Sequence, residues 1–558
     1  MDYNILIGGS AGQGMETISS ILEKILQKRR YEIFTTRDYM SRIRGGHNFI
    51  QIRFSIDKIT SHSDKLDLIV ALNEETIDIH KKRLKNKGII IGEKDFNYND
   101  KKFMGIPLNE ISKKIGNLRV KGSIAVGSVL KLFGFNNDFI MDILKKTFKK
   151  DELITVNMNA IEEGFNCLEK IFDVPKGNSK DKILINGNES IALGAIAANC
   201  KFYSAYPMTP STSIMTYIAS KMEEAQIVVE QAEDEIAAIN MAIGASYAGV
   251  RAMTGTSGGG FALKVEGLGL AAMLETPLVI AEVQRPGPTT GFPTRTEQSD
   301  LKFIITSAQG EFPRMVISVK HPEDAFFQTV RAFNLADKYQ IPVVIMNDQF
   351  LADYTTTVDP FDIDKVTRDR YIDNFIHGEY VRYKITKNGV SPRIIPGKIK
   401  DKLVLVDSDE HDESGHITES AEDRVKMNDK RMRKLDYLKD ELIEPDFFGN
   451  KEADILLLGW GSMHGPLKEA VKELNILNIK TKALVFGDIW PLPTKLIQNE
   501  VKGINKIINV EQNATGQLNL IIKEVLCVSC TDSILKYDGR QLSAGEIVDR
   551  VKNIIKLK

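Results

Sequence analysis

The chain has 558 residues, 42% of them hydrophobic and 27% charged, which is too long for a single core and typical of a globular protein of several domains. Its 74 Lys and Arg residues balance 75 Asp and Glu residues, so the composition excludes the basic surface that binds nucleic acid or an anionic membrane. No apolar run reaches the roughly 18–20 residues of a membrane span, and the first residues lack a basic signal-peptide start, so we expect a cytoplasmic protein.

The first part of the chain, residues 1–175, predicts an α/β domain. Short apolar strands are expected at residues 4–8, 48–54, 66–72 and 88–92, and residues 15–28 have the apolar spacing of a helix. Strands that alternate with helices are typical of this fold class.

A glycine-rich turn, GGSAGQG, joins the first strand to the first helix at residues 8–14. Backbone N–H groups in such a turn can bind an anion or a phosphate, and Gly9, Gly12 and Gly14 are the candidates. Their spacing is GxxGxG with Ala11 in the middle, so the dinucleotide fingerprint GxGxxG is not met. A tight turn without a ligand stays open as an alternative, and the stretch RIRGGH from Arg42 to His47 slightly favours the anion site.

A polar linker at residues 174–182 precedes a second α/β pattern, which we assign to residues 183–360. Strands, loops and helices recur there every 20–35 residues or so, which predicts a mostly parallel sheet. In such sheets ligands bind at the carboxyl ends of the strands.

The loop AYPMTPST, residues 205–212, is stiff and rich in hydroxyl groups. Proline fixes its own φ and restricts the residue before it, here Tyr206 and Thr209. Tyr206, Thr209, Ser211 and Thr212 place four hydroxyl groups on this stiff loop. That combination predicts a site for a small polar ligand.

Carboxylates and small residues surround the next two predicted strands. Glu230 closes a strand, and Glu233 to Glu235 open a helix with many alanines and glycines, predicted over residues 232–249. The segment TGTSGGG, residues 254–260, follows the next strand as a predicted loop, where glycines admit a close ligand. Acidic residues also suit the start of any helix, but together these features outline a pocket for a planar cofactor.

A long loop, QRPGPTTGFPTRTEQ, covers residues 284–298. Its prolines indicate an ordered and therefore functional loop. Arg285 and Arg295 are its cations, and arginine suits bidentate capture of a carboxylate. Solvent-facing arginines on a surface loop are the alternative.

Residues 361–450 break the α/β pattern and are polar and charge-dense, so we interpret them as a linker segment with a solvated face. The alternation returns at residues 451–558. Of the cysteines at positions 167, 200, 527 and 530, only the last two form a CxxC pair, and one pair completes neither a zinc nor a four-iron site. We therefore assign no metal to this chain.

These motifs, in this order, resemble the α subunit of 2-oxoacid:ferredoxin oxidoreductases, in the form with a γ-type domain fused at the N-terminus. The resemblance covers nearly the whole chain. It is carried by GGSAGQG and RIRGGH in the first domain, by YPMTPST, EQAEDEIAAINMAIGASYAG, TGTSGGG and GPTTGFPTRTEQ in the second, and by SPRIIPG, DEHDESGHITESAEDRVKMNDKRMRKL, LLGWGSMHGPLKEAV and NVEQNATGQL later. It implies a γ-type domain at residues 1–175, a pyrimidine-binding core of the thiamine-enzyme type at 183–360 and a last domain like the transketolase C-terminal domain at 451–558.

The resemblance also implies roles for particular residues. Thr209 would hydrogen-bond the bound 2-oxoacid beside Tyr206, and an arginine, Arg295 first and Arg285 second, would meet its carboxylate. Glu235, with Glu230 as the alternative, would be the carboxylate that shares a proton with N1′ of thiamine diphosphate. The strand end Thr254, Gly255, Thr256, Ser257 and Gly258 would contact that cofactor.

The chain lacks the GDG…N segment that holds Mg²⁺ and the diphosphate in thiamine enzymes, because GDIW at residues 487–490 does not match it. In the family this segment and the 4Fe–4S cluster lie on a β subunit, so we expect a shared active site, coenzyme A as cosubstrate and ferredoxin as electron acceptor. The expected reaction is oxidative decarboxylation of a 2-oxoacid, with 2-oxoglutarate favoured, to acyl-CoA and CO₂. A nucleotide-binding dehydrogenase and a non-catalytic assembly subunit of a redox complex are the alternatives.

Overall fold

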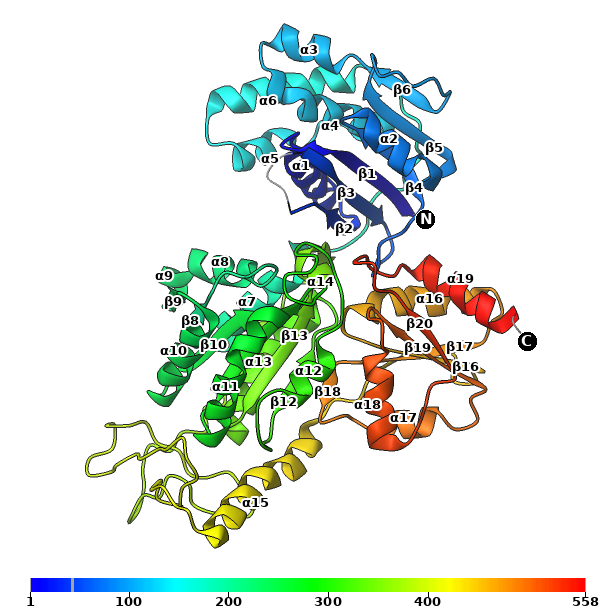
Figure 1. Cartoon of the computed structure of the whole chain (residues 1–558). Coiled ribbons are helices and arrows are strands. Elements are labelled where there is room, and N and C mark those ends of the chain that lie inside the picture. Colours follow the sequence, from blue (N-terminus) through cyan, green and yellow to red (C-terminus); the bar gives the residue numbers. More distant parts are fainter. Residues whose placement is uncertain (1, 42–44, 557–558) are drawn as a thin grey trace. The chain divides into compact units, whose positions relative to one another are not determined.

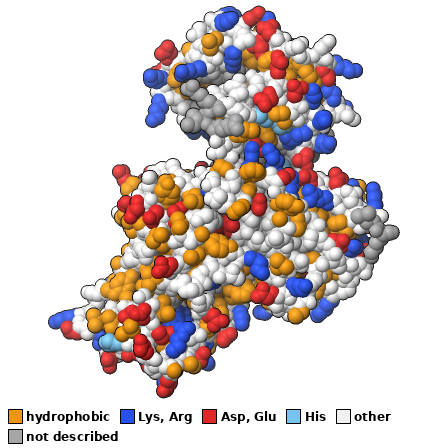
Figure 2. Space-filling view, viewed as in Figure 1, with side chains coloured by type: hydrophobic (Ala, Val, Ile, Leu, Met, Phe, Trp, Pro, Cys, Tyr) orange, Lys and Arg blue, Asp and Glu red, His pale blue; other side chains and the backbone are white. Residues whose placement is uncertain are grey.

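The computed structural model describes residues 2–41 and 45–556 of the chain (Figure 1). The chain divides into two compact units, the first made of Met1–Ile185 with Asp353–Pro360 and the second of Asn186–Ala352 with Phe361–Lys558. On the face that Figure 2 shows, acidic and basic side chains are interspersed, in keeping with a net charge of −1. In the described part of the chain, none of the helices is both long enough and apolar enough to cross a bilayer.

The first unit is built on an eight-stranded sheet of described residues, in the order β6-β5-β4-β1-β3-β2-β14-β7. Strand β1 pairs in parallel with β4 and antiparallel with β3, so one half of the sheet is parallel and the other antiparallel. The strands are β1 (Asp2–Ala11), β2 (Glu32–Asp38), β3 (Gly45–Ser55), β4 (Leu66–Ala71), β5 (Leu84–Glu93), β6 (Phe103–Ile106), β7 (Ile183–Ile185) and β14 (Thr355–Val358); the helices are α1 (Met15–Lys28), α2 (Glu74–His80), α3 (Leu108–Ile115), α4 (Lys121–Leu132), α5 (Ile140–Thr147) and α6 (Asp151–Phe165).

Strand β14 shows where the predicted domain boundaries differ from the structure. It lies between β2 and β7, pairing Thr355 with Thr35 and Val358 with Ile183. Both ends of the predicted second domain, 183–360, therefore belong to the first unit: residues 183–185 and Asp353–Pro360. The sequence of β14 is an ordinary β-branched run, which carries no information about which sheet it joins.

The second unit contains two sheets of described residues, seven strands in the order β18-β12-β13-β11-β10-β8-β9 and five in the order β15-β17-β16-β19-β20. Both are parallel except for the edge strands β18 and β15, which confirms the predicted α/β class with mostly parallel sheets. The strands are β8 (Cys200–Ala205), β9 (Val228–Gln231), β10 (Arg251–Thr256), β11 (Leu278–Gln284), β12 (Met315–Ser318), β13 (Pro342–Asp348), β15 (Asp446–Gly449), β16 (Ile455–Trp460), β17 (Thr481–Phe486), β18 (Asp488–Trp490), β19 (Lys506–Glu511) and β20 (Asp532–Leu535).

Helices cover both faces of the seven-stranded sheet (Figure 1). Strands β10, β11 and β13 are buried along their whole length, as parallel strands between two helical layers must be. The helices of this unit are α7 (Gly187–Ala197), α8 (Thr212–Ser220), α9 (Met222–Ala225), α10 (Glu235–Tyr247), α11 (Gly258–Met273), α12 (Leu301–Thr306), α13 (Pro322–Tyr339), α14 (Gln349–Asp353), α15 (Ala421–Leu438), α16 (His464–Ile476), α17 (Lys495–Glu500), α18 (Gln517–Leu526) and α19 (Ala544–Lys556).

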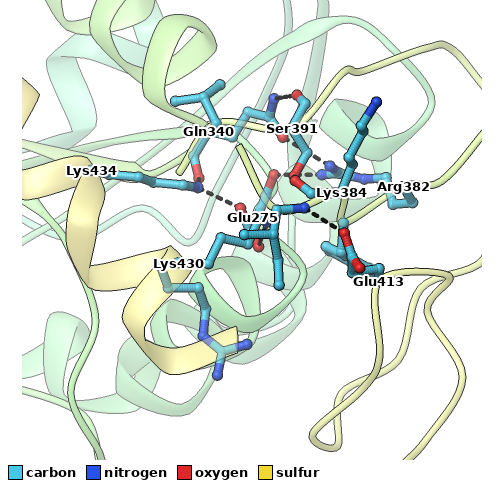
Figure 3. Close-up of polar contacts among 12 residues, drawn as sticks. Glu275, Gln340, Arg382, Lys384, Ser391, Glu413, Lys430 and Lys434 are labelled. Carbon is cyan, nitrogen blue, oxygen red and sulfur yellow. Dashed lines mark hydrogen bonds and ion pairs between the residues drawn. The ribbon is translucent and has the colours of Figure 1, made fainter. Parts of the chain in front are cut away.

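Residues 361–450 are packed onto the second unit rather than extended as a linker. They are irregular apart from short turns, helix α15 and the edge strand β15, but α15 inserts Lys430 and Lys434 into the protein (Figure 3). Their ammonium groups lie 2.5 and 2.6 Å from the two carboxylate oxygens of Glu275, at the end of α11, and all three side chains are fully buried. Arg382 donates to the backbone carbonyl of Glu275 at 2.8 Å.

This cluster carries more positive than negative charge, and the pKa values reflect it. Burial lowers the pKa of Lys430 to about 7. Burial alone would raise the pKa of Glu275, but Lys430 and Lys434 hold it well below its usual range. Glu275 is therefore the counter-charge that keeps the segment in place.

We predict that Glu275→Gln destabilises the chain far more than Lys430→Met. The first change leaves buried cations without a counter-charge, which costs about 3–5 kcal/mol. The second leaves the pair between Lys434 and Glu275 intact and removes a charge that burial already disfavours. Urea unfolding at neutral pH measures both; equal losses would show that other contacts hold the segment.

Candidate functional site

The candidate site lies where strands β8, β10 and β11 end. These strands are parallel neighbours, with Ser204 beside Thr254 and Thr256 beside Glu282. Their carboxyl ends therefore meet at one edge of the sheet, which is the usual position of ligands in such folds. The loop at 206–211, the start of α11 and the long loop at 285–300 follow these three strands.

A hydrogen bond joins two of these segments. The guanidinium Nη1 of Arg285 donates to the carbonyl oxygen of Thr209 at 2.7 Å. Burial lowers the pKa of Arg285, and Asp300 opposes that shift. Tyr206, at the start of the loop, is 40% exposed. The hydroxyl of Ser211 donates to the backbone carbonyl of Met208. The loop that was predicted to bind a small polar ligand thus has a guanidinium group against it.

Arg295 lies in a different part of the long loop. Its Cβ is 3.0 Å from the place that a side chain on Gly539 would occupy, and the next residue, Thr296, donates its N–H to the carbonyl of Gly539. Gly539 follows β20 in the five-stranded part of the unit. Of the two candidate arginines, the structure brings Arg285 to the Thr209 loop, and the role of Arg295 stays a prediction.

Glu235 is the first residue of α10, which Asp234 caps by accepting the N–H of Ala237 at 2.8 Å. The side chain of Glu235 is only 3% exposed, and its Oε1 has no hydrogen-bond partner among the described residues. Glu230, the alternative, is exposed on β9. A buried carboxylate oxygen without a donor is costly unless a ligand supplies one, which favours Glu235 as the functional group.

The segment TGTSGGG is not a loop, which corrects the prediction. Thr254, Gly255 and Thr256 are the last residues of β10, Ser257 is the N-cap of α11, and Gly258 is its first helical residue. A Cβ on Gly260 would lie 2.4 Å from Oε1 of Glu235 and 2.2 Å from Oγ1 of Thr256. The glycines therefore let the first turn of α11 approach buried polar groups, and Ser257 Oγ also lacks a partner within the described chain.

Lys264 supports this arrangement and was missed by the sequence analysis. It is fully buried on α11, and its Nζ donates to the carbonyl of Glu235 at 3.1 Å and to Oγ1 of Thr254 at 2.9 Å. Burial lowers its pKa to about 8, against the pull of Glu235 and Asp234. The available signal was one lysine among glycine, alanine and apolar residues in the stretch GGGFALKV.

The far end of the long loop is fixed by Gln298. Its N–H donates to the carbonyl of Gln512 at 2.7 Å, its Oε1 accepts the N–H of Gln512, and its Nε2 donates to the carbonyl of Trp460 at 3.0 Å. Its own carbonyl accepts from Asn513 at 3.0 Å. Both ends of the loop are therefore held before any ligand binds.

The glycine turn of the first unit lies beside a cavity of about 820 Å³. Gly12 and Gly14 line it with φ of 91° and 82°, and Arg119 and Lys121 lie in its wall. Gly9 is still within β1 and does not line the cavity. Arg42 to Arg44 of the RIRGGH motif lie outside the described residues. The wall also contains the carboxylate of Glu93, and the anion site at this turn stays a prediction.

The four cysteines are Cys167, Cys200, Cys527 and Cys530. All four are free thiols, and no group of three or more His, Cys, Asp or Glu side chains within residues 2–41 and 45–556 is arranged to hold a metal ion. The assignment of metal to a partner chain stays a prediction.

Two family descriptions match the chain. Residues 193–430 match the thiamine-diphosphate-binding domain of pyruvate flavodoxin/ferredoxin oxidoreductases, and residues 4–167 match a pyruvate ferredoxin/flavodoxin oxidoreductase domain. The fold and the matched domains define a ferredoxin-dependent oxidoreductase of 2-oxoacids with a thiamine diphosphate domain.

The family of this chain follows from relatives that match it over nearly its whole length. The α subunit of a 2-oxoacid:ferredoxin oxidoreductase from a Sulfolobus species is 32% identical, over all of this chain and 97% of that one. The structure of 2-oxoglutarate:ferredoxin oxidoreductase from Magnetococcus marinus, with 2-oxoglutarate, coenzyme A and succinyl-CoA bound, is 32% identical with a TM-score of 0.94 over 99% of both chains. The 2-oxoglutarate synthase subunit KorA of Methanothermobacter marburgensis is 33% identical over 66% of this chain and 98% of its own length. The chain belongs to the 2-oxoacid:ferredoxin oxidoreductase family.

We predict that Gly260→Ala disturbs Glu235 while Gly244→Ala does not. The added methyl group at Gly260 overlaps Glu235 and Thr256, and overpacking of this kind costs about 1–3 kcal/mol. Gly244 lies on α10, and a methyl group added there would have no neighbouring atom within 4 Å, so alanine should be neutral or stabilise by about 0.5–1 kcal/mol. Unfolding of the two variants by urea compares them; if both match the parent, Glu235 moves aside freely and Gly260 is no packing constraint.

Proposed function

We propose that this chain is the α-type component of a thiamine diphosphate-dependent enzyme that oxidises a 2-oxoacid, with 2-oxoglutarate favoured, to acyl-CoA and CO₂ and passes the electrons to ferredoxin. The observation that carries the proposal is the buried, unpartnered carboxylate oxygen of Glu235 opposite Gly260, on the same sheet edge as Thr209 and Arg285. The names of the relatives supply the reaction and its substrates.

The residues present fit the aminopyrimidine part of thiamine diphosphate. The ring needs one carboxylate aimed at its N1′, and the buried Oε1 of Glu235, which has no partner among the described residues, offers it. Beside it, a Cβ on Gly259 would have only the carbonyl oxygen of Thr289 nearby, at 3.6 Å. The cofactor, when bound, supplies the carbanion chemistry of decarboxylation. Glu235 would hold a proton at N1′, and Lys264 keeps the start of α10 in place through its hydrogen bond to the carbonyl of Glu235.

Thr209 and the arginines would bind the substrate. The loop around Thr209 is held by Asn188, which donates to the carbonyl of Pro210 at 2.9 Å, so its conformation is set in advance. Arg285 offers a guanidinium group beside that loop for a carboxylate of the 2-oxoacid. Arg295 remains a second candidate, for example for a distal carboxylate of 2-oxoglutarate.

The sequence offers no ligand set for Mg²⁺ or for a 4Fe–4S cluster, so we assign both to a β-type partner that completes the active site and delivers electrons to ferredoxin. Coenzyme A is bound in the Magnetococcus marinus structure. In this chain we assign its phosphates to the cavity beside Gly12 and Gly14, with Arg119 and Lys121 as counter-charges.

Ferredoxin-linked turnover of the chain co-purified with its partner tests the proposal. We expect CoA-dependent reduction of ferredoxin with 2-oxoglutarate, pyruvate or branched 2-oxoacids in parallel assays, and loss of activity in Glu235→Gln by about 10²–10⁴-fold with Glu230→Gln as the control. Reduction of NAD without CoA would favour the dehydrogenase alternative, and no turnover with any 2-oxoacid would favour an assembly subunit. Loss in Glu230→Gln alone would move the carboxylate role to the strand.

We predict that Arg285→Ala raises KM for the 2-oxoacid more than KM for coenzyme A, and that Thr209→Ala does the same to a smaller extent. Loss of an arginine–carboxylate pair in a shielded site costs roughly 2–5 kcal/mol. Arg295→Ala is the matched variant from the same loop. Steady-state kinetics decide between the arginines: a large change in Arg295→Ala with a normal KM in Arg285→Ala would return the role to Arg295.

A further inference from the structure

Two carboxyl groups that neither the motifs nor the proposed mechanism uses lie together at the end of β11. Glu282 is fully buried on the strand, and the buried Oδ2 of Asp300 comes from the residue before α12. Each of the two carboxyl groups acts on the pKa of the other. Asp300 is fixed there because its N–H donates to Oε1 of Gln284 at 3.1 Å.

A hydrogen bond between the two carboxyl groups requires a proton, because no other group in the described part of the chain donates to these oxygens. Both carboxylate oxygens of Glu282, and Oδ2 of Asp300, have no N–H or O–H donor in the described part of the chain. An ionised carboxylate only accepts hydrogen bonds, so two ionised groups here would repel each other in a buried site. One proton held between them removes the repulsion and satisfies both groups.

The surroundings place this pair inside the candidate site. The carboxylate of Asp300 lies against Gly258, where a Cβ would be 2.3 Å from Oδ2, so it contacts the first residue of α11. Arg285, one residue past β11, is the cation whose charge acts on Asp300. The acidic groups that face the pair are Asp348, at the end of β13, and Glu297, in the long loop.

We propose that Glu282 and Asp300 share a single proton and together present one negative charge to Arg285, as positioning residues for the arginine that binds the substrate carboxylate. The role of Arg285 in this statement rests on the proposed function; the shared proton does not. With one proton the pair and Arg285 sum to zero charge, whereas two ionised carboxylates would leave a net negative charge that repels an anionic 2-oxoacid.

The pKa directions agree with this charge count. Burial raises the pKa of Glu282 well above its usual value, and Asp300 and Asp348 add to the rise. Burial also raises the pKa of Asp300, to about 6, although Glu282 and Arg285 oppose it. The pair therefore carries one proton at neutral pH and gains a second below about pH 6.

The sign of the stability effect follows from the raised pKa of Asp300. Because the folded chain holds this proton more tightly than the unfolded chain, the contribution of Asp300 is full at low pH and is lost as pH rises from about 4 to about 6. In Glu282→Gln the amide donates to an ionised Asp300, whose pKa then falls. The loss should therefore move to lower pH by about one unit or more.

The first experiment uses the full chain without partner or substrate. Infrared spectra in heavy water near pH 8 should show a protonated carboxyl band in the parent that is absent from Glu282→Gln and present in Glu297→Gln, the control from the same loop. Thermal unfolding across pH 4–7 should show the shifted loss in Glu282→Gln only. Asp300→Asn provides a second variant, because its amide can likewise replace the shared proton. A band that persists in both Glu282→Gln and Asp300→Asn, or an unchanged unfolding profile, overturns the proposal.

The second experiment uses the active complex. Glu282→Gln should keep kcat within about threefold, since an amide hydrogen bond replaces the shared proton at nearly equal free energy, and shift the pH dependence of KM for the 2-oxoacid toward acid. The double variant Glu282→Gln/Asp300→Asn removes the charge and should lower that KM. An unchanged KM profile in both variants overturns the link to Arg285. Absence of 2-oxoacid turnover in the parent would instead count against the proposed function, while the infrared result stands by itself.

Discussion

The absence of two side chains at the start of α11 is the constraint on which the candidate site depends. Gly258 packs against Asp300 and Gly260 against Glu235, and a methyl group at either position would lie within 2.4 Å of a carboxylate oxygen. Because contacts this short are not tolerated, a larger residue at either position would have to displace a carboxylate or the helix itself. The two glycines therefore allow the buried carboxylates of Asp300 and Glu235 to lie on either side of the first turn of α11.

The loops around that turn are held in place by hydrogen bonds that need no ligand. Arg285 fastens the start of the long loop to the carbonyl of Thr209, and Gln298 fastens its end to Gln512 and Trp460. A site that is ordered in advance loses less conformational entropy when its ligand arrives. The five-stranded part of the second unit therefore contributes to the candidate site through the loop it anchors, although the site's own hydroxyl and carboxylate groups come from the seven-stranded part.

Periodic and turn-bounded segments could be predicted from the sequence, and contacts between distant segments could not. The helix at residues 15–28 has the predicted bounds, and the strand expected at 66–72 is Leu66–Ala71, one residue shorter, because apolar spacing predicts both elements. The helix expected from residue 232 begins at Glu235, since Asp234 caps it. The three glycines from Gly258 to Gly260 predicted a loop because glycine disfavours helices. In the structure they begin α11, where Gly258 and Gly260 pack against carboxylates.

The residues that were missed act through partners far away in the sequence. The sequence around Lys264 does not show that its ammonium group bonds Thr254 and Glu235. Lys430 and Lys434 belong to a charged run that predicts a solvated face, but they are buried against Glu275. The pairing of Glu282 with Asp300 depends on a loop of fifteen or so residues returning to its own strand, which no local pattern encodes. Glu235 could be chosen because a family pattern, not periodicity, pointed to it.

Strand β14 gives the chain an order of assembly. Strands β14 and β7 form one edge of the first unit's sheet, and β14 is synthesised only after the whole stretch from Asn186 to Ala352. Until then the edge of β2 exposes unpaired N–H and carbonyl groups, a state that invites pairing with other chains. The sheet of the amino-terminal unit can therefore be completed only after a large part of the second unit has been synthesised, and a gene split between the two units would have to supply another cover for that edge.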